Sequence, residues 1–247
     1  RLTYQAAEKV GVPLPRTSYI TDEAELADFI EHRADSFQFP LFLKMENSHY
    51  LVSRYGTKGV ICHSTHQIRE AYRRFDGFGG DLLVQEMMTG DVERIMTVLL
   101  ALDRNSDPLG FSINEKKRSS GRFLSGTMVV SAWSDELLRH SLKLAKELGY
   151  YGYAGFQYKY DSRDGSFKFL EVNGRISMSN SLSRRCGANL PYLMYADAAY
   201  GNLQPVTDFS RKYSLGIIWW YAVDDVLAYL RYNRQFLSPW QYVKSLI

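Results

Sequence analysis

The residues with the clearest chemical potential lie in one short segment, Glu171-Val172-Asn173-Gly174-Arg175. Alternate residues of a β-strand project to the same face, so Glu171, Asn173 and Arg175 are predicted to share one side of a strand. A carboxylate and an amide oxygen suit a hard cation such as Mg²⁺, and a guanidinium suits phosphoryl oxygens. A solvated strand face with Glu–Arg pairing would give the same pattern, so the triplet alone leaves both interpretations open.

A predicted hairpin adds another oxygen to this face. Strands over 153–160 and 167–172 flank a turn-rich stretch, and a loop over 162–166 would place Gln157 opposite Glu171. The inference depends on register, because a slip of one residue would turn one of the two side chains to the other face.

Two lysines are candidates for phosphate binding. Lys44 ends the apolar strand expected over 39–44, and Lys58 lies in the segment Gly56-Thr57-Lys58-Gly59. A lysine is a mobile point charge, and glycines allow backbone amides to approach a phosphate. An ordinary hairpin turn with solvated lysines explains either residue equally well on its own.

A third candidate is the strand over 81–85, which ends at Gln85 and continues into Glu86, Met87 and Met88. Such a polar strand edge can offer backbone donors and acceptors to a purine while methionine packs on its ring. Methionine as core filler is the simpler interpretation of this stretch when it is taken alone.

The elements expected around these residues indicate an α+β fold. Helices are predicted over 2–10, 22–32, 64–75 and 134–148, and the strands come in antiparallel pairs as well as singly. The sequence contains neither a GxGxxG nor a GxxxxGK[ST] motif, so a Rossmann fingerprint and a P-loop are unsupported. The apolar run from Leu215 to Val223 is predicted to be a buried strand.

Composition excludes several classes of protein. The chain has 247 residues, 45% hydrophobic, with a net charge of +3, which argues against a nucleic-acid-binding footprint. No apolar run reaches the ~20 residues of a membrane helix. Cys62 and Cys186 cannot form a disulfide scaffold, and no cysteine–histidine spacing suits zinc, so we expect a reducing, cytoplasmic location. The chain opens at Arg1 without a signal-peptide pattern. The missing initiator Met suggests that something upstream was removed or that the sequence begins partway through a longer protein.

The order of these motifs resembles the ATP-grasp family. The match extends from about Leu2 to Gly201, and its most specific element is the segment 169–175. The other matching segments are Gly11-Val12-Pro13, Phe39-Pro40-Leu41-Phe42-Leu43-Lys44, Tyr55-Gly56-Thr57-Lys58-Gly59-Val60 and Val84-Gln85-Glu86-Met87-Met88 with Gly90-Asp91-Val92-Glu93.

The resemblance implies two α+β lobes with mostly antiparallel sheets that grip a nucleotide between them. The implied divisions are a first helix and linker over 1–15, a small lobe over 16–90, a large lobe over 91–205 and a C-terminal extension over 206–247 that packs on the core. The family usually has an α/β domain ahead of this region, which the sequence does not show.

The resemblance also assigns roles to residues. The implied nucleotide contacts are Lys44 and Lys58 for the phosphates, Gln85, Glu86 and Met88 for adenine, and Glu93 for the ribose. The implied metal ligands are Glu171 and Asn173, with Gln157 at a third position, and the implied catalytic residues are Arg175 with Lys117 and Arg118 from the basic cluster over 116–118.

Two residues depart from the family pattern. Gln157 stands where the family has a glutamate, which removes a negative charge and puts a second Mg²⁺ in doubt. Gly174 stands in the middle of what is usually Asn-Pro-Arg, a change that loosens the backbone but keeps the ligands.

The implied activity is that of an ATP-dependent carboxylate–amine ligase of the carbon–nitrogen-forming class, which acts through an acyl phosphate. Its implied cofactors are ATP and one or two Mg²⁺ ions, with Mn²⁺ as a substitute, and its substrates are an amino acid or a short peptide and an amine. No nucleic acid or membrane partner is expected, and a homodimer is a possible assembly. The alternatives are an ATP-binding protein without ligase activity, and an interaction module that uses the aromatic region from Trp219 to Trp240.

Overall fold

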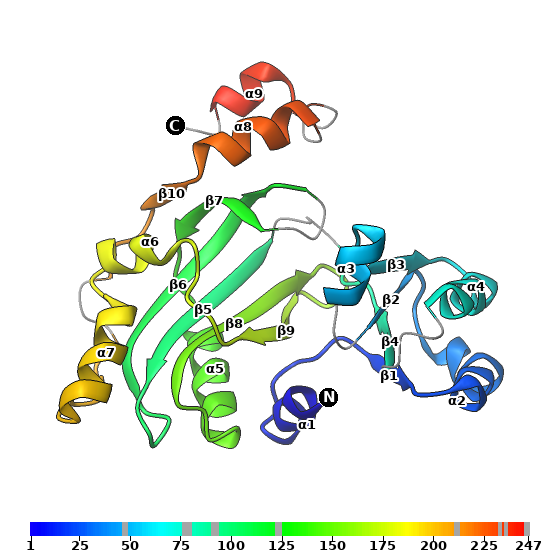
Figure 1. Ribbon diagram of the computed structural model, residues 1–247, viewed down its shortest axis with the longest axis horizontal. Helices are drawn as coiled ribbons and strands as arrows, with labels where there is room; N and C mark the ends of the chain where they lie inside the picture. The colour runs from blue at the N-terminus through cyan, green and yellow to red at the C-terminus, as the bar shows by residue number, and fades with distance from the viewer. Residues whose placement is uncertain are drawn as a thin grey trace. The chain divides into compact units, whose positions relative to one another are not determined.

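The computed structural model describes residues 1–45, 49–75, 81–89, 94–121, 125–209, 213–231, 234 and 237–244. The chain divides into two compact units, one formed by Leu14–Thr89 with Arg1 and the other by Leu2–Pro13 with Gly90–Ile247 (Figure 1). Each unit contains helices and an antiparallel sheet, so the predicted α+β class is confirmed. No helix in the described part of the chain is both long and apolar enough to cross a membrane.

The first unit is built on a four-stranded sheet in the order β1-β4-β2-β3. Buried Leu41, Leu43 and Val84 pack with the helical side chains of Phe29 and Ile68 to form its core. The strands are β1 (Thr17–Ile20), β2 (Leu41–Met45), β3 (Gly59–Cys62) and β4 (Leu82–Glu86), and the helical segments are α2 (Glu23–Asp28), η1 (Phe29–Arg33), η2 (Ala34–Ser36), α3 (His49–Tyr55) and α4 (Thr65–Phe75).

Side-chain caps fix the starts of α2 and α4 in this unit. The backbone N–H of Glu25 donates to the Asp22 carboxylate at 2.8 Å, and the N–H of Gln67 donates to the Ser64 hydroxyl at 3.3 Å. Each cap satisfies a backbone donor that the first turn of a helix leaves without an intrahelical partner.

The second unit is built on a six-stranded sheet in the order β10-β7-β6-β5-β8-β9 (Figure 1). Its strands are β5 (Ile95–Leu102), β6 (Pro108–Ser119), β7 (Gly126–Ser131), β8 (Gly152–Asp161), β9 (Ser166–Asn173) and β10 (Ile218–Trp220). Its helices are α1 (Leu2–Lys9), α5 (Asp135–Glu147), α6 (Asn180–Arg185), α7 (Leu190–Tyr200), α8 (Ala222–Arg231) and α9 (Pro239–Lys244).

The two faces of this sheet are covered differently. On one face Tyr158 of β8 is fully buried, and its hydroxyl is hydrogen-bonded to that of Ser141 on α5 at 2.9 Å. On the other face α7 lies so close to β6 that a Cβ at Gly110 would be 2.5 Å from the Cδ1 atom of Leu193. The α7 contact is apolar and involves one part of the face, where Leu99 and other buried side chains pack on the helix.

The prediction of a buried strand from Leu215 to Val223 is wrong. Only Ile218–Trp220 forms a strand, β10, and it lies at the edge of the sheet, paired with β7 alone. Ile218 and Trp220 are 44% and 42% exposed. An edge strand has one neighbour instead of two, and the apolar composition of a short run does not reveal how many neighbours it has.

A buried aspartate ties the C-terminal helices to this sheet. Asp225 of α8 is fully buried, and it accepts hydrogen bonds from the side chains of Arg118, Thr127, Trp220 and Tyr242 at 2.6–3.0 Å. Burial alone would raise the pKa of Asp225, but these hydrogen bonds outweigh burial and hold the pKa below its ordinary value. The donors come from β6, β7, β10 and α9, so one carboxylate joins four elements.

We expect Asp225→Asn to lower the free energy of unfolding by about 3 kcal/mol, because it leaves the buried guanidinium of Arg118 without its counter-charge. Urea denaturation followed by circular dichroism measures the loss. The matched control is Asp224→Asn on the same helix, a half-exposed carboxylate that should change stability by less than about 0.5 kcal/mol. Equal losses in the two variants would contradict this account of Asp225.

Candidate functional site

A row of polar side chains crosses β6, β5, β8 and β9 on the same face of the second sheet as the apolar contact with α7. Thr97 of β5 pairs with Asn114 of β6 on one side and with Gln157 of β8 on the other, and Gln157 pairs with Glu171 of β9. Directly paired residues project to the same face with Cβ atoms about 5 Å apart. The expected pairing of Gln157 with Glu171 is therefore confirmed, and the row extends beyond it by two strands.

The hairpin has the predicted pairing of Gln157 with Glu171, but its loop length and the pairing between the loop and Gln157 differ from the prediction. β8 ends at Asp161 and β9 begins at Ser166, opposite Asp161, so the loop is one residue shorter than expected and the predicted loop over 162–166 is wrong. A shift between Gln157 and Tyr158 compensates, because Tyr158 pairs with Phe169 while Gln157 pairs with Glu171. The extra residue lies in β9, and this β-bulge restores the alignment of Gln157 with Glu171.

Glu171 and Asn173 lie on one face, as predicted. The Asn173 side-chain amide donates to a Glu171 carboxylate oxygen at 3.0 Å, and both side chains are accessible. Arg175 was expected to share this face of the strand, but β9 ends at Asn173. Strand alternation therefore does not determine the position of the Arg175 side chain. Its position depends on the segment that follows the strand.

The oxygen donors of this face fit one kind of metal site. Among the described residues, no group of three or more His, Cys, Asp or Glu side chains could hold a metal ion. Glu171, Asn173 and Gln157 together offer one carboxylate and two amide oxygens. Mg²⁺ commonly takes one or two protein carboxylates and completes its shell with phosphate oxygens and waters. The donor set therefore fits a Mg²⁺ ion shared with a phosphorylated ligand and does not fit a site made of protein ligands alone.

Sequence reasoning missed the other half of the row, Thr97 and Asn114. Asn114 is only 4% exposed, and its side-chain nitrogen is buried without a hydrogen-bond partner among the described residues. Its alignment follows from the β5–β6 register, which the hairpin turn between these strands could have suggested. Lys116 and Lys159 both pair with Ile95, so each lies two residues beyond the row on the same face.

The two basic residues that the sequence favoured lie elsewhere. Lys117 is the extra residue where the β6–β7 register shifts, and its ammonium group forms an ion pair with Glu115 at 2.7 Å. Arg118 is 6% exposed and bonded to the buried carboxylate of Asp225 at 2.8 Å. This ion pair accounts for the burial of Arg118, and the assignment of either residue to a phosphate stays a prediction.

In the first unit one candidate lysine, Lys44, lies on β2, and the other, Lys58, lies just before the neighbouring strand β3. Lys44 on β2 pairs with Gly59 at the start of β3, and Lys58 precedes that glycine. A Cβ at Gly59 would lie 2.5 Å from the carbonyl oxygen of Leu43, so only glycine allows the strands to approach this closely. Lys44 is half-buried and Lys58 exposed. Their assignment to phosphates stays a prediction.

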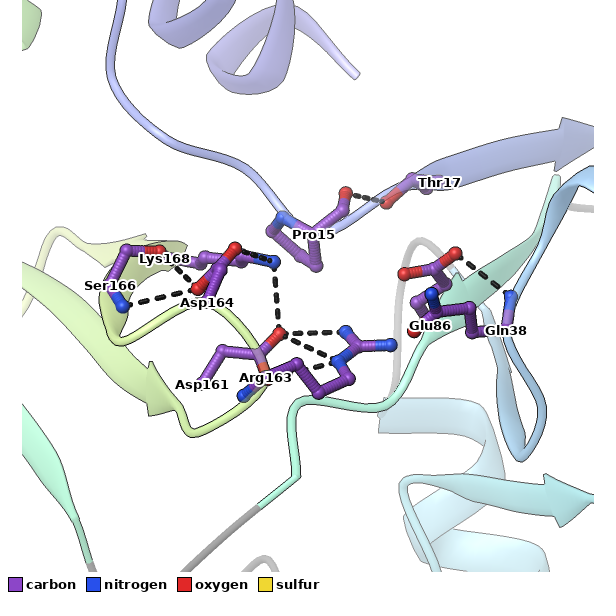
Figure 2. Close-up of polar contacts among 9 residues, drawn as sticks. All are labelled: Pro15, Thr17, Gln38, Glu86, Asp161, Arg163, Asp164, Ser166 and Lys168. Carbon is purple, nitrogen blue, oxygen red and sulfur yellow. Dashed lines mark hydrogen bonds and ion pairs between the residues drawn. The ribbon is translucent and has the colours of Figure 1, made fainter.

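The predicted adenine-binding residues lie at the end of β4. Gln85 is 3% exposed, and its side-chain amide donates to the Thr17 hydroxyl at 2.8 Å. Glu86 accepts from the backbone N–H of Gln38 at 3.0 Å, as Figure 2 shows. Met88 follows the strand and is 7% exposed. Contacts of all three with adenine stay predictions, and Glu93, the predicted ribose ligand, lies outside the described residues.

A cluster of charges fixes the tip of the β8–β9 hairpin. Figure 2 shows the carboxylate of Asp161 bonded to Arg163 at 2.7 Å and to Lys168 at 2.9 Å. Lys168 also contacts Asp164 at 2.9 Å. Burial alone would raise the pKa of Asp161, but the hydrogen bonds from Arg163 and Lys168 dominate and hold the pKa well below its ordinary value. The cluster thus secures the hairpin whose register aligns Gln157 with Glu171.

The sequence is similar to a protein-family model and to a named ligase. A family model, "ATP-grasp in the biosynthetic pathway with Ter operon", matches residues 111–216. A D-aspartate ligase of Enterococcus faecium (strain Aus0004) is 24% identical over 249 residues, which cover 94% of this chain and 56% of that protein.

Solved structures share the fold at low sequence identity. The biotin carboxylase domain of the Hydrogenobacter thermophilus 2-oxoglutarate carboxylase matches with a TM-score of 0.65 and 19% identity, over 87% of this chain and 47% of that one. An L-amino acid ligase from Bacillus licheniformis matches with a TM-score of 0.56 and 19% identity, over 87% and 51%. The chain spans about half the length of each of these three relatives.

We expect Asp161→Asn to destabilise the protein at neutral pH and to have less effect in acid. Because the folded pKa of Asp161 is depressed, its contribution is complete above the unfolded value of about 3.9 and is lost as the pH falls through the folded value. Urea unfolding of both proteins at pH 7, 5 and 3 measures this difference in stability.

The matched control is Asp164→Asn, a carboxylate that binds the same Lys168 but is 49% exposed. Asp164→Asn should lower the free energy of unfolding by less than about 1 kcal/mol, because water screens an exposed ion pair. A stability difference for Asp161→Asn that does not change with pH would contradict the assigned role of this carboxylate.

Proposed function

We propose that the chain is a member of the ATP-grasp superfamily and that it takes part in the ATP-dependent ligation of a carboxylate to an amine, which the matching family model and the similar D-aspartate ligase support. The observation that carries the proposal is the placement of Glu171, Asn173 and Gln157 on one face of the second unit's sheet, with Gln157 paired with Glu171 and the Asn173 amide bonded to the Glu171 carboxylate. Oxygen donors of this number and charge suit a Mg²⁺ ion that is shared with nucleotide phosphates.

The proposed reaction has two steps. A substrate carboxylate oxygen attacks the γ-phosphorus of ATP, the bond between that phosphorus and the β,γ-bridging oxygen breaks, and ADP leaves. The amine nitrogen then attacks the carbonyl carbon of the acyl phosphate, the carbon–oxygen bond to phosphate breaks, and the amine loses a proton as the amide forms. Neither step needs an oxidant or a reductant.

The residues of the second unit contribute charge and position. Mg²⁺ would be held by Glu171 and Asn173, with Gln157 beside them. When bound, the ion would neutralise part of the phosphate charge. Arg175 would bind oxygens of the transferred phosphoryl group, since a guanidinium offers a fork of donors at a fixed spacing. Because phosphoryl transfer demands little covalent chemistry from the protein, such positioning accounts for most of the catalysis.

The basic residue that would stabilise the developing charge comes from β6. Lys117 and Arg118 were favoured by sequence, and Lys116 is the residue of this cluster on the same sheet face as Gln157. In the first unit Lys44 and Lys58 would contact phosphates, Gln85, Glu86 and Met88 would contact adenine, and Glu93 the ribose.

We propose an amino acid or short peptide as the carboxylate substrate. A D-aspartate ligase and an L-amino acid ligase among the relatives support this class. ATP with Mg²⁺ as the cofactor pair is supported by a neighbour described with MgADP, and Mn²⁺ remains a proposed substitute. A dimer described for that same neighbour supports a homodimer. We propose a cytoplasmic location for this activity.

A second candidate function is nucleotide binding without ligation, and Gln157 favours it. The amide leaves Glu171 as the only carboxylate of the three proposed ligands, so the site would hold a second divalent ion poorly. Stabilisation by Mg·ATP with no ADP formed over a broad panel of acids and amines would support this function over the first.

We expect Glu171→Gln and Arg175→Ala to lower ADP formation at least about 100-fold, since each removes a charge that balances the reacting phosphoryl group. The assay measures ADP release from Mg·ATP with amino acids and amines as substrates. Glu147→Gln, on α5 and ion-paired with Lys9, is the matched control and should retain activity. All variants should keep the wild-type circular dichroism spectrum, and ADP release at the wild-type rate by Glu171→Gln would refute the assignment.

A further inference from the structure

The segment that leaves β9 carries Arg175, but the strand does not position it. Asn173 is the last residue of β9, and Gly174 and Arg175 are both exposed beyond it. A catalytic arginine must nevertheless be held close to one orientation, because a displacement of about 1 Å can cost 100-fold in rate. Some other contact must therefore fix this part of the backbone.

One contact is made at Gly174. A Cβ built on this residue would lie 2.8 Å from the hydroxyl oxygen of Tyr150, closer than real Cβ atoms come. The Tyr150 hydroxyl donates to the backbone carbonyl of Tyr153 at 3.1 Å, and its ring is half-buried. A tyrosine ring turns about only two torsions, so its oxygen cannot fold away as the end of a lysine could. The hydroxyl thus occupies the space that a side chain at position 174 would need, which explains why this chain has glycine where the resembled family has proline.

A second contact is made three residues further along. The backbone N–H of Ser177 donates to the Tyr153 hydroxyl at 3.2 Å. The Tyr153 ring packs against the buried cluster that includes Leu99 and Leu190, so the acceptor is anchored in the core. Burial raises the pKa of the Tyr153 hydroxyl above its ordinary value.

We propose that Tyr150 and Tyr153 are positioning residues that hold the backbone of residues 173–177 at two points and so orient Asn173 and Arg175. What Asn173 and Arg175 bind rests on the function proposed above, whereas the mechanical part of the proposal does not. Tyr150 limits the segment at Gly174 by direct contact, and Tyr153 holds it at Ser177 by a hydrogen bond. The two tyrosines are joined to each other by the bond from the Tyr150 hydroxyl to the Tyr153 carbonyl.

The test is a double-mutant cycle between Gly174→Ala and Tyr150→Phe. Alanine adds only a Cβ, and phenylalanine removes only the oxygen that this Cβ would meet. The binding probe is AMP-PNP, titrated by calorimetry with Mg²⁺ and again with EDTA. We expect Gly174→Ala to reduce the Mg²⁺-dependent gain in affinity about 10-fold, as loss of a residue that supports a metal ligand typically does, and to leave the EDTA value unchanged.

The cycle separates positioning from general destabilisation. In the double variant the Cβ enters the vacated space, so its Mg²⁺-dependent gain should return to within about 2-fold of that of Tyr150→Phe alone. Tyr151→Phe, on an exposed neighbouring ring, is the control and should bind as the wild type does. An equal effect of Gly174→Ala in the presence and absence of the Tyr150 hydroxyl would overturn the proposal.

Amide hydrogen exchange gives a readout that does not depend on nucleotide binding. We expect Tyr153→Phe to speed exchange at Ser177 at least 10-fold, and Gly174→Ala to speed exchange over 173–177 unless Tyr150→Phe accompanies it. Unchanged exchange in these variants would overturn the proposal. If wild-type protein shows no Mg²⁺-dependent gain, the proposed function fails, and exchange alone then decides whether the tyrosines hold the segment.

Discussion

The pairing of Gln157 with Glu171 across β8 and β9 is the constraint on which the candidate site depends. Side chains on a strand alternate between faces, so a slip of one residue would turn Glu171 toward the face that packs on α5. The hairpin tip pairs Asp161 with Ser166, and without an extra residue in β9 this tip pairing would leave Gln157 one residue out of register with Glu171. The extra residue restores the register. The buried carboxylate of Asp161, bonded to Arg163 and Lys168, holds the tip in place.

The two faces of this sheet differ in what they carry. One face is buried against α5, and the other is covered by α7 near Gly110 and Leu99. The polar row from Asn114 to Glu171 lies on this second face, outside the apolar contact with α7. A rigid strand places each donor of the row more exactly than a loop could, and only Arg175 depends on a segment outside the sheet.

Local signals in the sequence predicted much of this arrangement. The caps at Asp22 and Ser64 follow from short-range patterns, and the alignment of Gln157 with Glu171 was expected from the hairpin. The hairpin prediction reached the correct pair through an incorrect loop, because it could not include a bulge, whose position depends on packing in both strands.

Other features depend on contacts between distant parts of the chain. The burial of Arg118 requires Asp225, which lies 107 residues away, and no local pattern predicts that pair. The edge position of β10 and the alignment of Asn114 with Thr97 likewise require the strand order of the whole sheet. Sequence patterns therefore indicated which residues could perform the chemistry, and long-range packing determined which of them share a face.

The central claim is that Glu171 and Asn173 hold the metal ion of a bound nucleotide. The most direct measurement is a crystal structure of the protein with Mn²⁺ and AMP-PNP, in which anomalous scattering locates the metal without reference to the protein atoms. The account predicts an anomalous peak within about 2.3 Å of oxygens from both Glu171 and Asn173 and of a phosphate oxygen. A peak bound to other side chains, or a nucleotide bound with no metal at this face, would contradict it.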